Sequence, residues 1–408
     1  MKRLLAAVLL VTTLFGTAGI TKKALELISE GWTVDTEGAV VADFNSDGEE
    51  DIALVYYQID PEFEIENRTN RVLVALSEGK KLNRVVDQGL PWGEDFGVEV
   101  SLDYVEGILT IFQHRGIMHQ FNEWGLTWDE DQQSFLERKS AWGGIAGLGS
   151  SGYFDAVSGT GSVQKVWDDV EITVEYANIH AKELEGELTL DGHATEADWQ
   201  RPPSCNHYWV NWGSENWGDE ADASISLKAL YDPANLYLYV EVADDDLVLP
   251  EDPEGLLHAD HLELWIDRLT PDISVQELGY VYDDWERKKD EYTVQIAVTN
   301  GKDGTTISQM WLPEEDIKNP GVVAGFGYDN GVYTVELSLP WDVIHPRGPV
   351  DYFSFSAVYS DSDNPDNPKQ ETLIGTSTVR WAEPFTFGTL LTYEPELIYW
   401  GIEPLEDY

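Results

Sequence analysis

Cysteine is nearly absent from this chain of 408 residues, and histidine and methionine are scarce. Cys205 is the single cysteine, so no intramolecular disulfide can form, and its neighbours Asn206 and His207 make no recognisable triad. No nucleophile elbow, HExxH motif or phosphate-binding loop occurs, and the histidines do not cluster at metal-ligand spacing. Carboxylates are so abundant that no pair stands out for glycoside hydrolysis. A role other than catalysis is therefore favoured.

Basic residues are also few, with 25 Lys and Arg against 76 Asp and Glu and a formal net charge of −51. Such a field repels nucleic acid and anionic membranes, so we expect neither as a partner. The excess carboxylates fit a solvated acidic surface and also a set of cation sites. We expect both, because each calcium site uses only a few carboxylates.

Long hydrophobic runs are missing, and the apolar run Leu4–Phe15 is too short to span a bilayer comfortably. It follows Lys2 and Arg3 and precedes the small residues 16–18, which is typical of a cleaved export signal. We expect a signal peptide over residues 1–18 and a secreted or periplasmic protein without membrane insertion; an uncleaved N-terminal anchor is the alternative. An exported chain without disulfides needs another stabilising device, and bound metal is the obvious one.

Hydrophobic residues make up 42% of the chain, which is enough for real cores. Short β-rich runs recur between Gly, Asn, Asp and Pro, and Leu236–Val242 alternates apolar with mixed positions. This pattern predicts an all-β protein of antiparallel sheets. We expect two domains, a β domain with a calcium loop over residues 24–185 and a β-sandwich over residues 186–394, followed by an acidic tail over 395–408.

An acidic stretch in the first domain places oxygen-bearing residues at every second position, and Gly48 permits the sharp turn around an ion. The expected calcium ligands are Asp43, Asn45, Asp47, Asp51 and, through its carbonyl, Glu49. An EF-hand needs a glutamate where Leu54 stands, so this loop is of another kind. The letters DFNSDGEEDIALV resemble the calcium loops of FG-GAP and VCBS-type repeats, which implies an ion that fixes the loop. An ordinary acidic turn is the alternative.

The second domain carries a series of short motifs in a fixed order. They are Leu190-Asp191-Gly192, Glu196, Trp199, Ala229–Tyr237, Val242–Asp246, Asp260–Asp267, Tyr333–Glu336, Pro340-Trp341, Asp361–Asp363, Arg380-Trp381 and Phe387–Leu390. Together they resemble the family 9 carbohydrate-binding modules. The resemblance implies a β-sandwich that binds the ends of sugar chains and carries structural calcium. The carboxylates at 244–246 and at Asp361, Asp363 and Asp366 are candidates for that calcium, with solvated acidic loops as the alternative.

A sugar site needs aromatic platforms and a few fixed polar groups, and the chain has 16 tryptophans. By position, Trp285 and Trp381 resemble the two aromatic walls between which family members hold a sugar; a core role is the alternative for each. Asp283, Glu291 and Arg380 are the expected hydroxyl partners. The Trp-rich segment 206–217 departs from the family pattern and fits either a second platform or a cover over the site.

We therefore predict a calcium-stabilised, non-catalytic protein that binds a polysaccharide or oligosaccharide end. Such modules usually accompany a glycoside hydrolase domain, and none is recognisable here, so a separate hydrolase is a candidate partner. One alternative is an extracellular structural or adhesion protein without sugar binding. Another is a haem-binding relative with Met310 as a ligand, which the three methionines make the least favoured.

Overall fold

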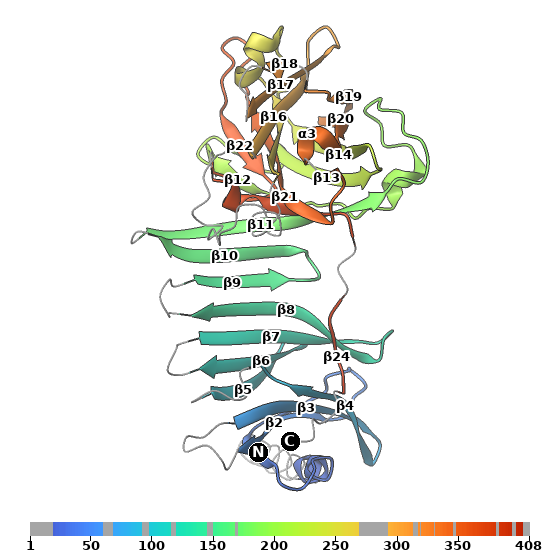
Figure 1. Cartoon of the computed structure of the whole chain (residues 1–408), viewed down its shortest axis with the longest axis vertical. Helices are drawn as coiled ribbons and strands as arrows, with labels where there is room; N and C mark the ends of the chain where they lie inside the picture. Colours follow the sequence, from blue (N-terminus) through green and yellow to red (C-terminus); the bar gives the residue numbers. More distant parts are fainter. Residues whose placement is uncertain are drawn as a thin grey trace, which may run out of the picture. The chain divides into compact units, whose positions relative to one another are not determined.

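The computed structural model describes residues 19–59, 68–91, 98–115, 120–144, 150–167, 170–268, 293–312, 317–318, 320–329, 331–345, 348–380, 383–393 and 397–402. Strands dominate these residues, which confirms the all-β prediction (Figure 1). No helix within the described ranges has the length and apolar character needed to cross a membrane. The predicted signal peptide, residues 1–18, lies outside the described residues.

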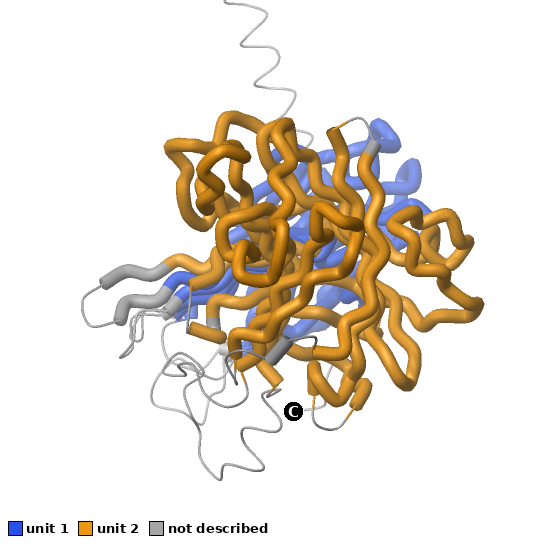
Figure 2. The backbone as a smooth tube through the Cα atoms, turned by 90° about the horizontal axis from the view of Figure 1, so that it is seen from above, with its two compact units in different colours: residues 1–158, 163–172, 396–408 blue, residues 159–162, 173–395 orange. Residues whose placement is uncertain are grey.

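Two compact units make up the chain (Figure 2). The first comprises residues 1–158, 163–172 and 396–408, and the second comprises residues 159–162 and 173–395. The structural division therefore falls within β11 (Val170–Glu183), and β11 ends inside the stretch 181–187 where the sequence suggests a boundary.

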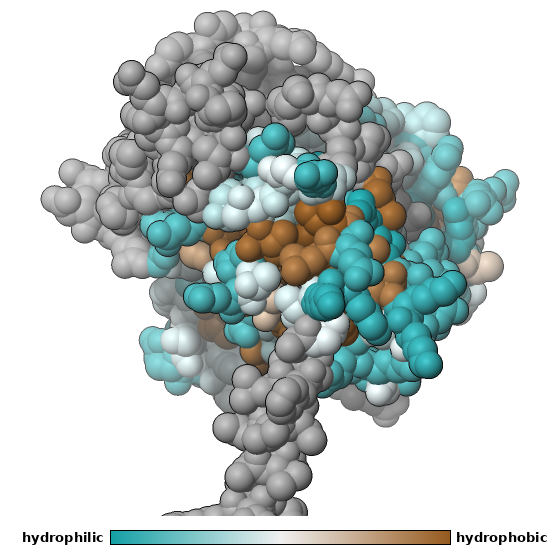
Figure 3. Space-filling model, turned by 90° about the horizontal axis from the view of Figure 1, so that it is seen from below, coloured by the Kyte–Doolittle hydropathy of each residue, from teal (hydrophilic) through white to brown (hydrophobic). Residues whose placement is uncertain are grey.

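The first sheet of unit 1 is an antiparallel meander with the order β1-β2-β3-β4. Its strands are β1 (Thr33–Ala42), β2 (Asp51–Ile59), β3 (Arg68–Glu78) and β4 (Lys81–Gly89). Both faces of β2 are apolar because both are covered. Ile52 and Leu54 pack beneath a helical turn at residues 19–25, whereas Ala53 and Val55 enter a core shared with the next sheet. In the view of Figure 3, hydrophobic residues gather in one area of the surface with hydrophilic residues around it.

The second sheet of unit 1 continues as an antiparallel meander in chain order from β5 to β9. Its strands are β5 (Val98–Val105), β6 (Ile108–Arg115), β7 (Gln120–Asp129), β8 (Ser134–Gly144) and β9 (Ser150–Asp155), and β10 (Thr160–Trp167) follows. Near the end of the chain, β24 (Tyr399–Trp400) pairs with β8. Trp400 is buried among Leu109, Leu126 and Phe135, and its Nε1 donates to Glu137 Oε2 at 2.9 Å. Trp400 is therefore part of the core of the first unit.

Unit 2 is a β-sandwich, as predicted. One sheet has the order β13-β14-β20-β19, with β11 parallel to β13. Its strands are β13 (Ala223–Tyr231), β14 (Asn235–Asp244), β19 (Val323–Asp329) and β20 (Val332–Pro340). The side chains of this sheet that point inward, such as Leu238, Val240 and Val335, pack against inward residues of the second sheet, such as Leu264 and Phe355.

The second sheet of the sandwich, here called sheet C, has the order β18-β17-β16-β15-β21-β22-β12. Its strands are β12 (Trp209–Trp212), β15 (His261–Asp267), β16 (Thr293–Asn300), β17 (Thr306–Leu312), β18 (Ile317–Lys318), β21 (Tyr352–Asp361) and β22 (Thr372–Gly375). β23 (Gly388–Leu391) joins β21 to β11. The described helical turns are η1 (Ala197–Gln200), η2 (Pro253–His258), α3 (Trp341–Ile344) and η4 (Pro384–Thr386).

Candidate functional site

Arg380 is the one residue of the predicted sugar site that the structure describes. Trp285, Trp381, Asp283 and Glu291 lie outside the described residues. The Arg380 side chain is 50% exposed, and its Nη1 lies 3.9 Å from Glu383 Oε2, too far for a hydrogen bond. Among the described residues, the buried atom Glu383 Oε2 has no hydrogen-bond partner. Arg380 and Glu383 therefore form an ion pair without a hydrogen bond at this position.

The backbone at Arg380 is fixed against the outer face of sheet C, the face that points away from the sandwich core. The preceding residue, Val379, is buried with Trp265, Val358 and Phe387. The rings of Trp265 and Phe387 meet edge to face, with centroids 5.6 Å apart. The Arg380 amide donates to Thr386 Oγ1 at 2.9 Å, which closes the short loop that contains η4. The anchor of this loop is therefore an apolar cluster on a rigid sheet.

The outer face of sheet C also carries a buried polar network that the sequence analysis missed. Alternate residues of β15 point outward, and among them Glu263 accepts hydrogen bonds from Trp265 Nε1 at 2.6 Å and from Gln295 Nε2 at 2.8 Å. His261 Nε2 lies 3.1 Å from Glu263 Oε1, and its Nδ1 lies 2.7 Å from the Ala259 carbonyl. The network holds a carboxylate in one orientation beneath this face. The sequence HLELWID of β15 could have indicated this network, because His, Glu, Trp and Asp alternate there with Leu, Leu and Ile.

Carboxylates from three strand ends converge at one end of the sandwich. Asp244 ends β14, Asp260 precedes β15 and Asp361 ends β21. All three are buried, and one oxygen of each lies within 4.8 Å of the others. A second group, formed by Asp222, Asp245 and Asp363, meets the same distance criterion. We call these six residues the acidic cluster.

The hydrogen bonds of the acidic cluster are incomplete. Asp260 accepts from the Val248 and Ser362 amides, and Asp244 accepts from Tyr359 Oη at 2.5 Å. In contrast, both carboxylate oxygens of Asp361 and Oδ1 of Asp363 are buried and have no hydrogen-bond partner in the described part of the chain. Buried acceptors normally have partners, so these oxygens have the character of cation ligands.

The electrostatics of the acidic cluster also indicate a cation site. Burial, reinforced by nearby carboxylates, raises the pKa of Asp260 to about 9 and the pKa of Asp361 to about 8. Burial and neighbouring carboxylates also raise the pKa of Asp363 to about 6. Three buried carboxylates cannot all be ionised side by side without a counter-charge. A divalent cation, coordinated by oxygen at about 2.3–2.6 Å as calcium is, would supply that charge.

The sequence analysis identified part of this cluster. It singled out Asp244, Asp245, Asp361 and Asp363, which the structure brings together. It missed Asp260 and Asp222. It also included Asp246 and Asp366, which belong to neither group of converging carboxylates within the described residues.

The acidic loop of the first unit has a different geometry. Asp43 accepts the amides of Asp47 at 3.0 Å and Gly48 at 2.9 Å, and Asp47 Oδ1 accepts the amide of Glu49 at 2.8 Å. Asp51 is fully buried and accepts the amides of Phe44 at 2.9 Å and Ser77 at 2.7 Å. Both groups of three converging acids found in the described parts of the chain are in unit 2. Calcium binding by this loop, which includes Asn45, remains a prediction.

The Trp-rich segment mixes buried and exposed rings. Trp209 packs partly against the sandwich core, and Trp217 Nε1 donates to the Ala223 carbonyl at 2.9 Å. Trp212, at the end of β12, is 54% exposed. One ring of the segment is therefore available to a ligand, and the other two contribute to the fold.

Comparison with known proteins identifies the sandwich. The profile of the family described as Carbohydrate family 9 binding domain-like matches residues 190–393. A family 9 carbohydrate binding module from Caldicellulosiruptor kristjanssonii, solved with glucose, is 13% identical, covers 54% of this chain and 97% of that chain, and has a TM-score of 0.35. A structure of such a module with cellotriose gives 13% identity, 54% and 95% coverage and the same TM-score of 0.35. No curated protein matches the chain.

Proposed function

The chain belongs to the carbohydrate family 9 binding domain-like proteins, and from this premise we propose that it binds the end of an oligosaccharide or polysaccharide without cleaving it. The site is the loop 380–387 on the outer face of sheet C. Trp285 and Trp381 are proposed as the aromatic walls, with Asp283, Glu291 and Arg380 as hydroxyl partners. The observation that carries the proposal is the half-exposed Arg380 guanidinium, paired with Glu383 at 3.9 Å, beside the apolar anchor on sheet C.

The chemistry of a sugar ring matches this surface. A pyranose presents a flat C–H face that stacks on an aromatic ring, and its edge carries hydroxyl groups that donate and accept hydrogen bonds. A guanidinium group donates to hydroxyl oxygens, and a carboxylate accepts from hydroxyl hydrogens. The half-exposed Arg380 guanidinium therefore supplies a donor at this position, and the carboxylates Asp283 and Glu291 are proposed as the acceptors. The bond from the Arg380 amide to Thr386 holds the Arg380 backbone in place before binding.

We propose calcium as the resident cation, held in unit 2 by the acidic cluster. The donor set is carboxylate oxygen throughout, which suits a hard cation. The buried, unpartnered oxygens of Asp361 are the observation that supports this assignment. The ion joins the ends of β14, β15 and β21 and does no chemistry on the sugar. A second calcium in the loop 43–51, and export through residues 1–18, are further parts of the proposal.

Calorimetric titration of residues 19–408 in calcium tests the sugar site, with glucose and cellotriose as the first probes in a panel of glycans. We expect the double variant Trp285→Ala/Trp381→Ala to lose the binding that the sandwich contributes, and Arg380→Ala to weaken that contribution about tenfold, since one hydrogen bond from a charged group is lost. Trp212→Ala, which removes an exposed tryptophan of β12, is the matched control and should bind normally.

Two outcomes would contradict the proposal. If the Trp212→Ala variant lost binding and the double variant did not, the Trp-rich segment would be the platform. If the folded, calcium-loaded protein bound no glycan, an extracellular structural or adhesion role would take the place of sugar binding.

A further inference from the structure

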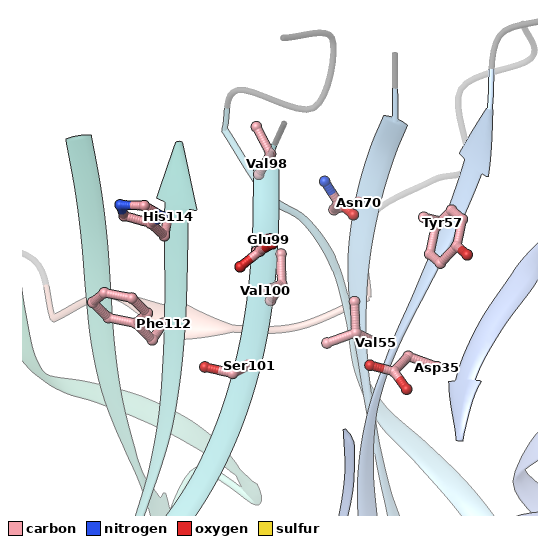
Figure 4. A pocket seen from close by; sticks show the side chains of 10 residues that line it. All are labelled: Asp35, Val55, Tyr57, Asn70, Val98, Glu99, Val100, Ser101, Phe112 and His114. Atoms are coloured by element: carbon pink, nitrogen blue, oxygen red, sulfur yellow. The ribbon is translucent and has the colours of Figure 1, made fainter. Parts of the chain in front are cut away.

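The first unit contains a cleft of about 390 Å³ between its two sheets. One side is formed by β1, β2 and β3 and the other by the edge strand β5 and its neighbour β6 (Figure 4). The valines 55, 98 and 100 form its apolar part. The volume is at the lower end of the range for small-ligand pockets, about 300–1,000 Å³, so one or two sugar-sized rings would fit.

Aromatic rings line the β6 side of the cleft and continue beyond it. Phe112 and His114 occupy alternate positions of β6, and their rings stack at 8° with centroids 6.4 Å apart. Phe121 of β7 stacks on Phe112 at 24° and 5.7 Å. The Phe121 ring lies against Gly143 of β8, where a Cβ atom would collide with it. Three rings therefore form a nearly parallel strip on one face of the sheet.

Polar groups stand beside this strip because of the strand register. β5 pairs with β6 so that Glu99 lies opposite His114 and Ser101 lies opposite Phe112, on the same face. Asp35 of β1 contributes a second carboxylate from across the cleft, and Asn70 and Tyr57 lie near it (Figure 4). Glu99 and Ser101 are exposed, so their side chains are open to a ligand.

The charge of the lining selects the ligand. Among the described residues, the cleft is lined by two carboxylates and by no lysine or arginine. Carboxylates only accept hydrogen bonds, so the ligand must offer O–H or N–H donors at its edge and an apolar face to the rings. An anionic ligand would meet two like charges and is excluded.

We propose that this cleft is a second saccharide site, which takes a pyranose ring that is neutral or carries an amine. Phe112 supplies the stacking face, and Glu99, which lies on the same face of the β5–β6 pair, accepts from the hydroxyl or ammonium groups. The site lies wholly within the first unit and uses none of the residues proposed for the sandwich. It extends the proposed function by giving one chain two places to contact the same polysaccharide, which raises avidity where both engage.

The test uses NMR of residues 19–408 with 13C-labelled histidine, and His114→Gln assigns the His114 signal. The probes are a glucose oligosaccharide, a glucosamine oligosaccharide and an oligouronate. We expect the His114 signal to move with the neutral probe, the amine-bearing probe or both, and to stay still with the oligouronate. Glu99→Gln should weaken this response about tenfold, the effect of one hydrogen bond to a charged group. The control Glu106→Gln changes an exposed acid at the β5–β6 turn, outside the cleft, and should leave the response intact.

The same response must persist in the Trp285→Ala/Trp381→Ala variant, which separates this site from the sandwich. Phe112→Leu keeps an apolar side chain but removes the flat ring, so it should abolish the His114 response. If that variant does not fold, the Glu99→Gln variant, whose substitution is at an exposed position, still tests the cleft. A His114 signal that no saccharide moves overturns the cleft and leaves the sandwich proposal standing. Full-strength glycan binding in the double tryptophan variant, lost in Glu99→Gln, would instead overturn the sandwich site and support the cleft.

Discussion

The two acidic regions of the molecule solve the problem of crowded carboxylates in opposite ways. In the loop 43–51, Asp43 and Asp51 each accept two backbone amides, so the loop provides its own counterparts to the negative charge. In the acidic cluster of the sandwich, Asp260 also accepts two backbone amides, but the buried Asp361 has no donor among the described residues. The comparison teaches that sequence spacing alone does not identify a metal site. What distinguishes the two is whether buried oxygens already have partners.

Removing calcium should reveal the largest difference between the two regions. We expect chelation to lower the melting temperature of the second unit by about 10 °C, because an ion present at about 1,000 times its Kd contributes about 4 kcal/mol. The first unit should change far less, since its loop carboxylates have backbone donors. Scanning calorimetry in calcium and in EDTA, with hydrogen exchange to assign each transition, provides the measurement. If both units lost the same number of degrees in melting temperature, the proposed difference between the two acidic regions would be wrong.

The pH dependence of that calcium effect sharpens the comparison. Without calcium, Asp260 and Asp361 have folded-state pKa values of about 9 and about 8, above the ordinary value of 3.8. A raised folded pKa stabilises the fold below the unfolded pKa, and this contribution is lost as pH rises through the folded pKa. Calcium must displace these protons, so its stabilising effect should grow between pH 5 and pH 8, by up to about 4 kcal/mol per displaced proton. Melting temperatures in calcium and in EDTA across this range check the sign, and a shift that shrinks with pH would contradict it.

Asp51→Ala should damage the first unit whether or not calcium is present. The substitution leaves the amides of Phe44 and Ser77 without their acceptor at a fully buried position, at a cost of about 3 kcal/mol. Glu50→Ala, at the adjacent exposed residue, is the matched control. Urea unfolding followed by the fluorescence of the first unit provides the measurement. A loss that appeared only in calcium would mean that the ion, and not the hydrogen bonds, holds the loop.

The effect of Asp361→Asn on the stability of the second unit should have opposite signs in chelator and in calcium. In chelator it removes one of three crowded buried carboxylates, so we expect the second unit to gain about 2 kcal/mol. In calcium it removes a ligand, so the stabilisation by the ion should fall. Asp366→Asn, in the same loop but outside the acidic cluster, should neither stabilise the second unit in chelator nor reduce its stabilisation by calcium. Destabilisation of equal size in both conditions would show that Asp361 serves packing alone.

The smallest expected effect concerns the proposed calcium of the first unit. Asp47→Ala removes an exposed carboxylate that accepts the Glu49 amide, so we expect a small loss in both conditions and a further loss of about 1 kcal/mol in calcium. The melting temperature of the first unit with and without calcium measures it. A change of the same size in both conditions would end the case for an ion in this loop.

Much of the fold was predictable because it depends on local patterns. Alternation in Leu236–Val242 predicted a strand with one buried face, and the series of such strands predicted antiparallel sheets; the family resemblance then implied the sandwich. The acidic cluster was predictable only in part. Asp260 joins Asp361 because β15 pairs with β21, His261 opposite Ser360, and no local signal records that register. The return of Trp400 to the core of the first unit is likewise a contact between distant residues, which the acidic composition of the tail concealed.

Native affinity electrophoresis of residues 19–408 in calcium, across gels that contain different polysaccharides, tests sugar binding most directly. The account predicts retardation by particular glycans, reduced by chelator and lost when Trp285, Trp381 and Glu99 are all replaced. Migration that no glycan retards, by protein verified as folded and calcium-loaded, would contradict it.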